Sequence, residues 1–381
     1  MTRILYIPHY PGYQLIKNRS YIIARELSGY TNVYFVQWHI PENKNFHTRL
    51  LTQFKNLGMK LHAEDKLNIL NMPLLFRPEN SIIKYAFNEM MVNSMIKGLG
   101  ITAVINASLN LIRLPRIKNV FKIYDLVDDH LETNQNLNID ARRLRQLADD
   151  IQCADLTTAI TEQVADKVRG RFNIEAVLVP NGVDMTLQQL LSIPERNKLS
   201  RAKIFGFIGN IHQKWVNLEL ALDAFYAHLA QEPQDIFRII GGGDIDYIEQ
   251  LRRKYNSPQI EFLGPVGQNE IYRHFAQIDI GVIPFHLSSF TENSLPIKAI
   301  EHGCFDSPVI STPVNALKKL SYVRFGQTVA DWQRLYKLLR EDITHIDKDE
   351  LRPYIWQDIV RQFYQDNICS LTERTLQTTG V

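Results

Sequence analysis

The residues best suited to chemistry in this sequence lie at positions 294–301, which read Ser-Leu-Pro-Ile-Lys-Ala-Ile-Glu. Ser294 is a favourable helix N-cap and Pro296 is favoured in a first helical turn, so we expect a helix that begins near Leu295. The N-terminus of such a helix offers backbone N–H groups to an anion. Glu301 lies about 10 Å further along, comparable to the reach from a diphosphate to a ribose. The segment therefore predicts a nucleotide site, with a surface ion pair between Lys298 and Glu301 as the alternative.

Three further loops that follow strand-like runs carry glycine or polar residues. Ligands of parallel α/β sheets bind where strands end and helices begin, so these loops are candidates for the same site. Lys214 is the candidate cation for a diphosphate, with an exposed surface lysine as the alternative. A short glycine run and a lone histidine are each weak signals. The predicted donor-side set is Gly209, Asn210, His212, Lys214, Gly241, Gly242, Gly243, His286, Asn293, Ser294, Leu295, Lys298 and Glu301.

Acidic residues follow a strand-like run in the N-terminal half, at Asp125, Asp128 and Asp129. A carboxylate in this position can deprotonate or orient a hydroxyl group, and Asp128 is our first choice. The alternative is that these acids are solvated and cap the next helix. We predict the three acids and Lys214 as catalytic residues. The predicted acceptor-side set, from the loop after the first strand-like run and from the acidic segment, is His9, Tyr10, Gly12, Tyr13, Arg19 and His130.

Short apolar runs alternate with amphipathic stretches along the whole sequence, a pattern typical of parallel sheets covered by helices. One series extends from residues 4–7 to 176–179 and a second from 203–208 to 308–311, with a turn-rich segment at 180–184 between them. An amphipathic stretch at 354–376 follows. We predict two doubly wound, Rossmann-like domains facing each other across a cleft. Their predicted limits are 1–182, joined by 354–381, and 183–353.

Charge is distributed unevenly along a chain whose formal net charge is only +2. Residues 1–120 carry 15 lysines and arginines against 6 acidic residues. This predicts a basic surface in the N-terminal half, which is either a solvated face or a surface that attracts anionic lipid or an anionic acceptor. No RNA-binding signature or interleaved aromatic pattern is present, so nucleic acid is a weak third choice.

Composition and the remaining motifs favour a globular enzyme of the cytoplasm. No apolar run approaches the roughly 20 residues of a membrane-spanning helix, and the first residues do not form a signal-peptide pattern. We therefore expect a cytoplasmic protein, with contact at the inner face of the membrane as an option. The three cysteines have neither metal-ligand nor disulfide spacing, and we expect no metal site.

The ordered motifs resemble the retaining GT-B glycosyltransferases of family 4, especially the bacterial branch that builds surface polysaccharides. The resemblance spans nearly the whole chain. In that family a glutamate at the position of Glu301 binds the donor ribose. Many members have a second glutamate eight positions earlier, where this sequence has Asn293. The motifs are YDLVDD at 124–129, VPNGVD at 179–184, FIGN at 207–210, IGGG at 240–243, FLGP at 262–265, DIGVIPF at 279–285 and LPIKAIE at 295–301.

The resemblance implies metal-independent transfer of a sugar, without a cofactor, from a nucleotide-sugar donor such as a UDP- or GDP-sugar. The acceptor would be a glycan, a lipid-linked glycan or another hydroxyl compound. Lys214 and the backbone N–H groups of residues 293–295 are the candidates to stabilise the departing diphosphate. A final helix that crosses back onto the N-terminal domain is also implied.

Three other functions are alternatives to this interpretation. A nucleotide-sugar epimerase of the same fold would bind a similar donor without needing an acceptor. A non-catalytic nucleotide-binding scaffold is the alternative from another class. A dinucleotide-dependent oxidoreductase is disfavoured because the loop after the first strand-like run lacks the glycine fingerprint.

Overall fold

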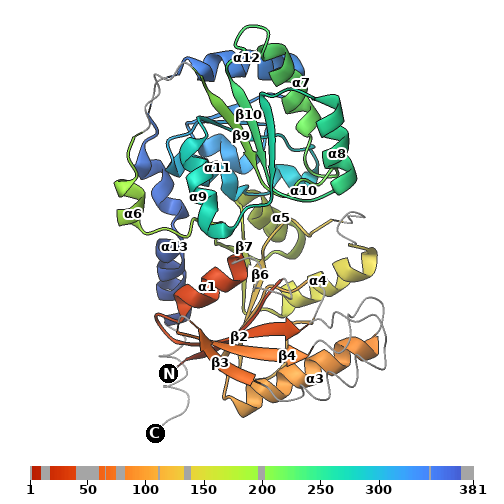
Figure 1. Ribbon diagram of the computed structural model, residues 1–381. Helices are drawn as coiled ribbons and strands as arrows, with labels where there is room; N and C mark the ends of the chain where they lie inside the picture. The colour runs from red at the N-terminus through yellow and green to blue at the C-terminus, as the bar shows by residue number, and fades with distance from the viewer. Residues whose placement is uncertain are drawn as a thin grey trace. The chain divides into compact units, whose positions relative to one another are not determined.

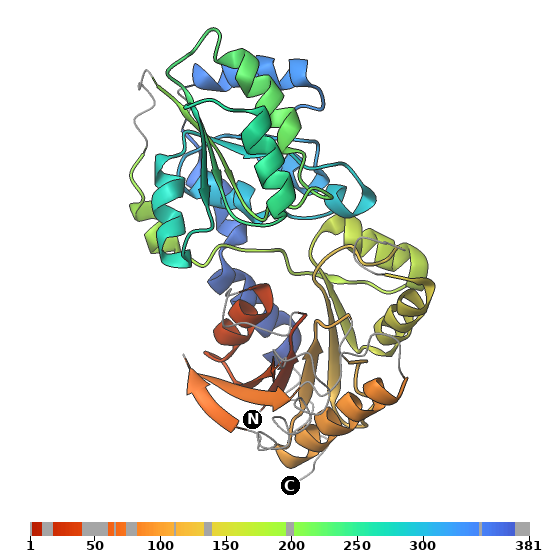
Figure 2. The same ribbon diagram turned by 45° about the vertical axis from the view of Figure 1, so that its right-hand side comes forward.

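The computed structural model describes residues 2–9, 18–39, 60–64, 66–73, 82–109, 112–132, 139–195, 202–342 and 345–369. The chain divides into two compact units (Figures 1 and 2). The N-terminal unit consists of Met1–Pro180 and Trp356–Val381, and the C-terminal unit consists of Asn181–Ile355. The long insertion between Pro180 and Trp356 therefore forms a unit of its own.

The N-terminal unit is built on an eight-stranded sheet with the order β3-β4-β2-β1-β5-β6-β7-β8. All neighbouring strands are parallel except β3 and β4. The central strand β5 is completely buried, as expected for a parallel strand covered on both faces. The strands are β1 (Arg3–Ile7), β2 (Asn32–His39), β3 (Lys60–Glu64), β4 (Leu67–Pro73), β5 (Ala103–Asn106), β6 (Phe121–Leu126), β7 (Leu156–Ala159) and β8 (Val177–Leu178).

Helices cover both faces of this sheet because alternate residues of each strand point in opposite directions. Ile4 and Tyr6 of β1 pack in one core with α1 (Arg19–Leu27) and α13 (Trp356–Phe363). Leu5 and Ile7 pack in another with α3 (Ile82–Gly98). Figure 1 shows α1 beside α13. The remaining helices are α4 (Ala141–Cys153) and α5 (Glu162–Phe172).

The C-terminal helix returns to the N-terminal unit, as predicted. Trp356, Ile359 and Phe363 from the predicted amphipathic stretch at 354–376 are all buried in the core that contains α1. The α-helical part is shorter than predicted, because α13 ends at Phe363 and a π-helical segment, Tyr364–Ile368, follows. The rest of the predicted helix, from residue 370 onwards, lies outside the described residues.

The C-terminal unit is built on a six-stranded, fully parallel sheet with the order β11-β10-β9-β12-β13-β14. The order reverses between β9 and β12, and such a reversal is where ligands of doubly wound sheets bind. The strands are β9 (Ile204–Ile208), β10 (Ile236–Ile240), β11 (Ile260–Gly264), β12 (Ile280–Ile283), β13 (Val309–Ser311) and β14 (Val323–Phe325).

Helices also cover both faces of this second sheet (Figure 2). One face carries α7 (Leu218–His228), α8 (Ile245–Lys254) and α12 (Val329–Arg340), which share a core with β9 and β10. The other carries α9 (Gln268–Gln277) and α11 (Ile297–Cys304), which meet where the Phe275 and His302 rings lie 4.8 Å apart. The shorter elements are α6 (Leu187–Ser192), α10 (Ser289–Glu292) and the 3-10 helices η2 (Asn315–Lys319) and η3 (Lys348–Tyr354).

The two predicted Rossmann-like domains are confirmed, but two strands were not predicted. β3 reads Lys-Leu-His-Ala-Glu, which has no continuous apolar run, and it pairs in the antiparallel direction at the edge of the sheet. β14 has only three residues and also lies at an edge. Among the helices of the described ranges, none is long and apolar enough to cross a membrane.

Candidate functional site

The loops after β9 and β12 are joined to each other at the point where the strand order reverses. Val216 and Phe285 form an antiparallel bridge. The Asn217 N–H donates to the Pro284 carbonyl at 2.6 Å, and the His286 N–H donates to the Trp215 carbonyl at 2.9 Å. Backbone pairing therefore fixes these two loops relative to each other. They carry the predicted donor-side residues Lys214 and His286.

The glycine run after β10 lets its loop pack directly against the loop after β9. Gly241 and Gly243 have φ values of 140° and 153°, which L side chains rarely adopt. A Cβ atom on Gly241 would lie 1.8 Å from the Gly209 carbonyl oxygen, and one on Gly243 would lie 2.0 Å from the Ile211 carbonyl oxygen. The close approach of the two backbones therefore explains why glycine is required at both positions. An anion cradle at Gly241, Gly242 and Gly243 stays a prediction.

Helix α11 begins later than predicted. Its first residue is Ile297, and its N-cap is Pro296 in an extended conformation, so Ser294 is not the N-cap. The Ser294 hydroxyl instead donates to the Thr291 carbonyl at 2.8 Å. The Asn181 side chain donates to the Leu295 carbonyl at 3.2 Å, which holds the chain extended just before the helix. Tertiary hydrogen bonding thus overrides the local capping signal.

Glu301 lies in the second turn of α11, about 6 Å along the helix axis from Ile297. Its carboxylate accepts a hydrogen bond from Lys298 Nζ at 2.6 Å, so the ion pair considered as the alternative is present. The Lys298 ammonium also lies 5.4 Å from the centre of the Phe275 ring. A carboxylate offers about four acceptor positions, so the pair with Lys298 leaves capacity for ribose hydroxyls.

Polar and aromatic side chains gather in the loop after β9. The Lys214 N–H donates to His212 Nδ1 at 3.3 Å, and His212 Nδ1 lies 3.5 Å from an Asp244 carboxylate oxygen. The Trp215 ring lies 6.2 Å from the His212 ring and 5.1 Å from the Phe290 ring of α10, measured between centres. Asn210 and Lys214 are exposed. Trp215 and Phe290 were not predicted as site residues.

Asn293 is buried immediately before the α11 segment, and its side-chain oxygen accepts a hydrogen bond from the Asn315 side chain at 3.4 Å. The Thr291 hydroxyl beside it donates to the His286 carbonyl at 2.6 Å. These bonds connect the segment before α11 with η2 and with the loop after β12. The predicted donor-side residues therefore belong to neighbouring loops and to α11, at one edge of the sheet.

In the N-terminal unit, Asp125 at the end of β6 is the centre of a buried polar network. Arg19 Nη2 donates to its carboxylate at 2.9 Å, and both side chains are at most 6% exposed. The Thr158 hydroxyl donates to it at 2.7 Å and the Tyr6 hydroxyl at 3.2 Å. Burial raises the pKa of Asp125, but Arg19 and these hydrogen bonds outweigh burial and leave the pKa below its usual value. Asp125 is therefore ionised and fully engaged.

Arg19, predicted on the acceptor side, lies in this network and contacts two further segments of the N-terminal unit. Its Nη1 donates to the Pro180 carbonyl at 3.0 Å. Its guanidinium lies 5.5 Å from the centre of the Trp356 ring. Arg19 thus connects β6 with Pro180, where the first chain segment of this unit ends, and with Trp356, where its second segment begins.

The two neighbouring acids differ sharply from Asp125. Asp129 is buried and forms an ion pair with Lys167 at 2.6 Å. For Asp128, burial raises the pKa to about 7; Arg19 opposes the rise, and Asp129 and Asp125 add to it. A carboxyl group with a pKa near neutral pH is well suited to exchange a proton. Of the three predicted acids, Asp128 therefore has the properties of an acid–base group.

The acceptor-side predictions are only partly covered by the described residues. Burial lowers the pKa of His9 and of His130 to about 4, so both imidazoles are neutral at pH 7. His9 Nδ1 lies 2.7 Å from the Ser20 hydroxyl at the start of α1. Tyr10, Gly12 and Tyr13 lie outside the described residues.

The hydroxyl residues that hold Asp125, which are Tyr6 and Thr158, were not predicted as site residues. Tyr6 and Thr158 are polar residues in buried strands. Thr158 lies directly opposite Asp125 in the parallel register of β6 and β7. Hydroxyl side chains in short, buried strands were the available signal. Within the ranges that the structure describes, no group of three His, Cys, Asp or Glu side chains is arranged to hold a metal ion.

Comparison with known proteins finds a family match within the C-terminal unit. Residues 202–335 match the family of glycosyl transferases group 1. TuaH of Bacillus subtilis strain 168, named as a teichuronic acid biosynthesis glycosyltransferase, is 27% identical over 186 residues, which cover 47% of this chain and 44% of TuaH. The match therefore spans less than half the length of this relative.

Solved structures resemble the chain over its full length. HepE from Anabaena, in complex with UDP and glucose, has a TM-score of 0.58 at 14% identity and covers 100% of this chain and 99% of its own. WaaG, a glycosyltransferase involved in lipopolysaccharide biosynthesis, has a TM-score of 0.59 at 12% identity and covers 99% and 100%. The predicted GT-B fold is confirmed, and residues 202–335 resemble the glycosyl transferases group 1 domain. Membership of family 4 stays a prediction.

We expect Asp128→Asn to remove a pH dependence of stability. With its pKa raised to about 7, folded Asp128 holds a proton more tightly than an unfolded aspartate, whose pKa is about 4. The stability that the proton contributes is full below about pH 4 and is lost as pH rises through about 7. Urea unfolding from pH 4 to 8 should show that the variant gains stability over the parent as pH rises, by on the order of 2–4 kcal/mol at pH 8.

Asp149→Asn in α4 is the matched control. Asp149 is exposed, so this substitution removes one carboxylate from the same unit without changing any buried charge. Subtracting the parent's free energy of unfolding from the variant's at each pH cancels the contributions of the other titrating groups. Parallel curves for Asp128→Asn and the parent across this pH range would contradict the raised pKa.

Proposed function

We propose that this chain, a GT-B glycosyltransferase with a glycosyl transferases group 1 domain, transfers a sugar from a nucleotide-sugar donor to a hydroxyl group of a glycan or lipid-linked acceptor. The product belongs to a surface polysaccharide or related glycoconjugate. The names of two similar proteins support this assignment, since TuaH is named for teichuronic acid biosynthesis and WaaG for lipopolysaccharide biosynthesis.

The observation that carries the proposal is the position of α11 at the edge where β9 and β12 end. Its N-terminus supplies backbone N–H groups and the positive end of the helix dipole for a diphosphate. Glu301, one turn further along, accepts hydrogen bonds from the ribose hydroxyls. UDP bound to HepE, which has the same fold, supports a nucleoside diphosphate as the ligand.

Transfer proceeds without a metal in this proposal. The bond between the anomeric carbon and the phosphate oxygen breaks, and its electron pair leaves with the nucleoside diphosphate. Lys214 and the N–H groups before α11 stabilise that charge. The acceptor oxygen bonds to the anomeric carbon with retention of configuration, and the acceptor proton passes to the departing phosphate. Asp128 orients the acceptor hydroxyl through a hydrogen bond.

The basic residues of the N-terminal half provide a second element of the proposal, contact with an anionic membrane surface where a lipid-linked acceptor would lie. The expected result is sedimentation with phosphatidylglycerol liposomes that fades as salt rises from low to physiological concentration. Phosphatidylcholine liposomes serve as the control. Failure to sediment even at low salt would remove this element and leave the transferase assignment intact.

Glu301→Ala should weaken UDP or GDP binding by about 10–100-fold, because hydrogen bonds to a charged group contribute about 1.5–3 kcal/mol. Isothermal titration calorimetry measures the change, and circular dichroism checks that the fold is kept. Glu270→Ala is the matched control, since it removes an exposed glutamate of α9 in the same unit and should change affinity far less. Unchanged affinity in Glu301→Ala would show that this glutamate serves only the ion pair.

Catalysis is tested with nucleotide sugars in the presence and absence of acceptor. A panel of nucleoside diphosphates and their sugars first identifies the donor, because a ligand that binds only the folded state raises the melting temperature. Product analysis should then show release of the diphosphate with sugar attached to acceptor. Rapid conversion of the donor to an epimer without acceptor would replace the proposal with an epimerase, and binding without turnover would replace it with a scaffold.

A further inference from the structure

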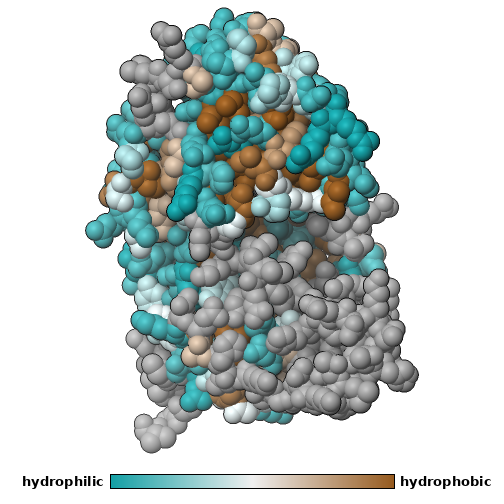
Figure 3. Space-filling model, in the orientation of Figure 1, coloured by the Kyte–Doolittle hydropathy of each residue, from teal (hydrophilic) through white to brown (hydrophobic). Residues whose placement is uncertain are grey.

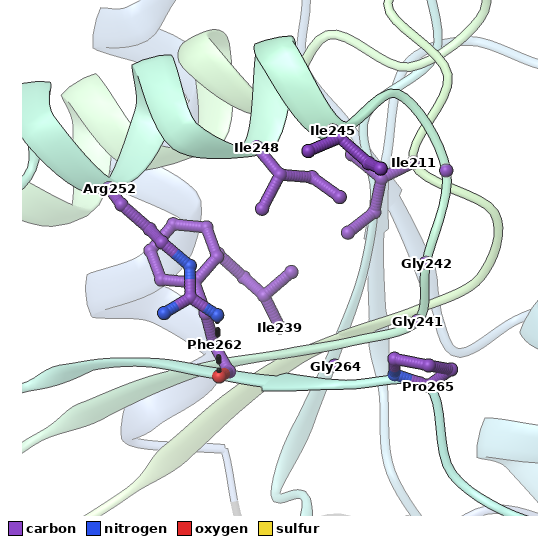
Figure 4. A pocket seen from close by; sticks show the side chains of 11 residues that line it. Ile211, Ile239, Gly241, Gly242, Ile245, Ile248, Arg252, Phe262, Gly264 and Pro265 are labelled. Carbon is purple, nitrogen blue, oxygen red and sulfur yellow. Dashed lines mark hydrogen bonds between the residues drawn. The ribbon is translucent and has the colours of Figure 1, made fainter.

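An apolar pocket lies in the C-terminal unit between α8 and the edge strand β11 (Figure 4). Its volume is about 380 Å³, within the range of small-molecule sites. Apolar side chains of α8, β10, β11 and the adjoining loops form its wall, together with glycines at the end of β11 and in the loop after β10. The apolar side chains are Ile211, Ile239, Ile245, Ile248, Phe262 and Pro265, and the glycines are Gly241, Gly242, Gly243 and Gly264. Figure 3 shows apolar surface gathered between α8 and α9, where β11 lies.

One end of this pocket borders the predicted donor-side loop, because Gly241, Gly242 and Gly243 contribute to its lining, but the pocket extends away from Glu301. Ile248 and Phe262 belong to the core that α8 shares with α7 and α12. Lys298, the ion-pair partner of Glu301, instead contacts Phe275 of α9 on the opposite face of the sheet. The apolar wall of the pocket and Glu301 therefore lie on opposite faces of the sheet, and the inference about the pocket does not rest on the proposed function.

One charged side chain lines the pocket, and it lies at one end. Arg252 follows Ile245 and Ile248 on the same stripe of α8, about 10 Å from Ile245 along the helix axis. Its guanidinium lies 5.0 Å from the centre of the Phe262 ring and donates to the Phe262 carbonyl at 3.2 Å (Figure 4). Stacking and this bond hold the cation in place, while a guanidinium has five N–H donors in total. The pocket thus has an apolar length and a positive end.

The same contact argues against an added β-strand in the groove. An edge strand recruits a peptide through its unpaired backbone groups, but Arg252 already occupies one carbonyl of β11. Ile245, by contrast, is 75% exposed at the mouth of the pocket, although it is a large aliphatic residue. A flexible apolar chain would cover Ile245 without needing backbone hydrogen bonds.

We propose that this pocket binds an anionic amphiphile, an alkyl chain that ends in a phosphate or carboxylate. The chain lies along Ile245, Ile248 and Phe262, and the anionic end pairs with Arg252. The present ion pair of Arg252 is weak, because Glu249 lies 3.7 Å away and both side chains are about half exposed. A phosphate or carboxylate bound by two N–H groups would replace it favourably.

Calorimetric titration with decyl phosphate, below its micelle concentration, tests the proposal. Inorganic phosphate supplies the head alone, and decyltrimethylammonium supplies the same tail with the opposite charge. We expect decyl phosphate to bind and neither of the other two to bind measurably. No binding of decyl phosphate, or equal binding of both amphiphiles, would overturn the proposal, the second result meaning adsorption to apolar surface only.

Variants with matched controls locate the site. Arg252→Gln and Ile245→Asp should each weaken decyl phosphate binding by about tenfold or more. Arg253→Gln on the same helix and Leu338→Asp on α12, both at exposed positions, should stay within about twofold of the parent. Unchanged melting temperatures show that each variant is folded. The proposal would also be overturned if Arg252→Gln and Ile245→Asp bound decyl phosphate as tightly as the parent.

Discussion

Parallel pairing of neighbouring strands decides where chemistry can lie in both units. Each parallel pair needs a crossover connection, so the carboxyl ends of the paired strands meet at one edge of the sheet. In the C-terminal unit that edge carries the joined loops after β9, β10 and β12 and the start of α11. In the N-terminal unit it carries His9 after β1 and the acidic segment after β6.

The same geometry forces charged groups against a buried sheet, and each is accommodated differently. Asp125 is ionised because Arg19, Thr158 and Tyr6 compensate for its burial. Asp129 obtains its compensation from Lys167. Asp128 obtains least, and its pKa rises accordingly. Asp128 can therefore exchange a proton near neutral pH because it receives the least compensation of the three neighbouring carboxylates.

The order of the elements was predictable because buried parallel strands such as β5 and β12 read as continuous apolar runs. Edge strands such as β3 lack that signal. The start of α11 was mispredicted since Ser294 looks like an N-cap, whereas the deciding contact comes from Asn181, 114 positions away in the sequence. For the same reason Arg19 and Asp125 were both predicted, but their pairing across 106 positions was not. Long-range partners of this kind leave no local pattern.

Arg19 touches the chain at both points where it passes between the units, through the Pro180 carbonyl and the Trp356 ring. Residues 1–180 and α13 are therefore one module with a discontinuous sequence, and residues 181–355 are a continuous insertion between its anchored ends. Anyone building hybrid proteins from this scaffold should exchange the insertion alone and keep the final helix with its own first segment. A chimaera joined once, near residue 180, would separate Trp356 from the guanidinium that anchors it.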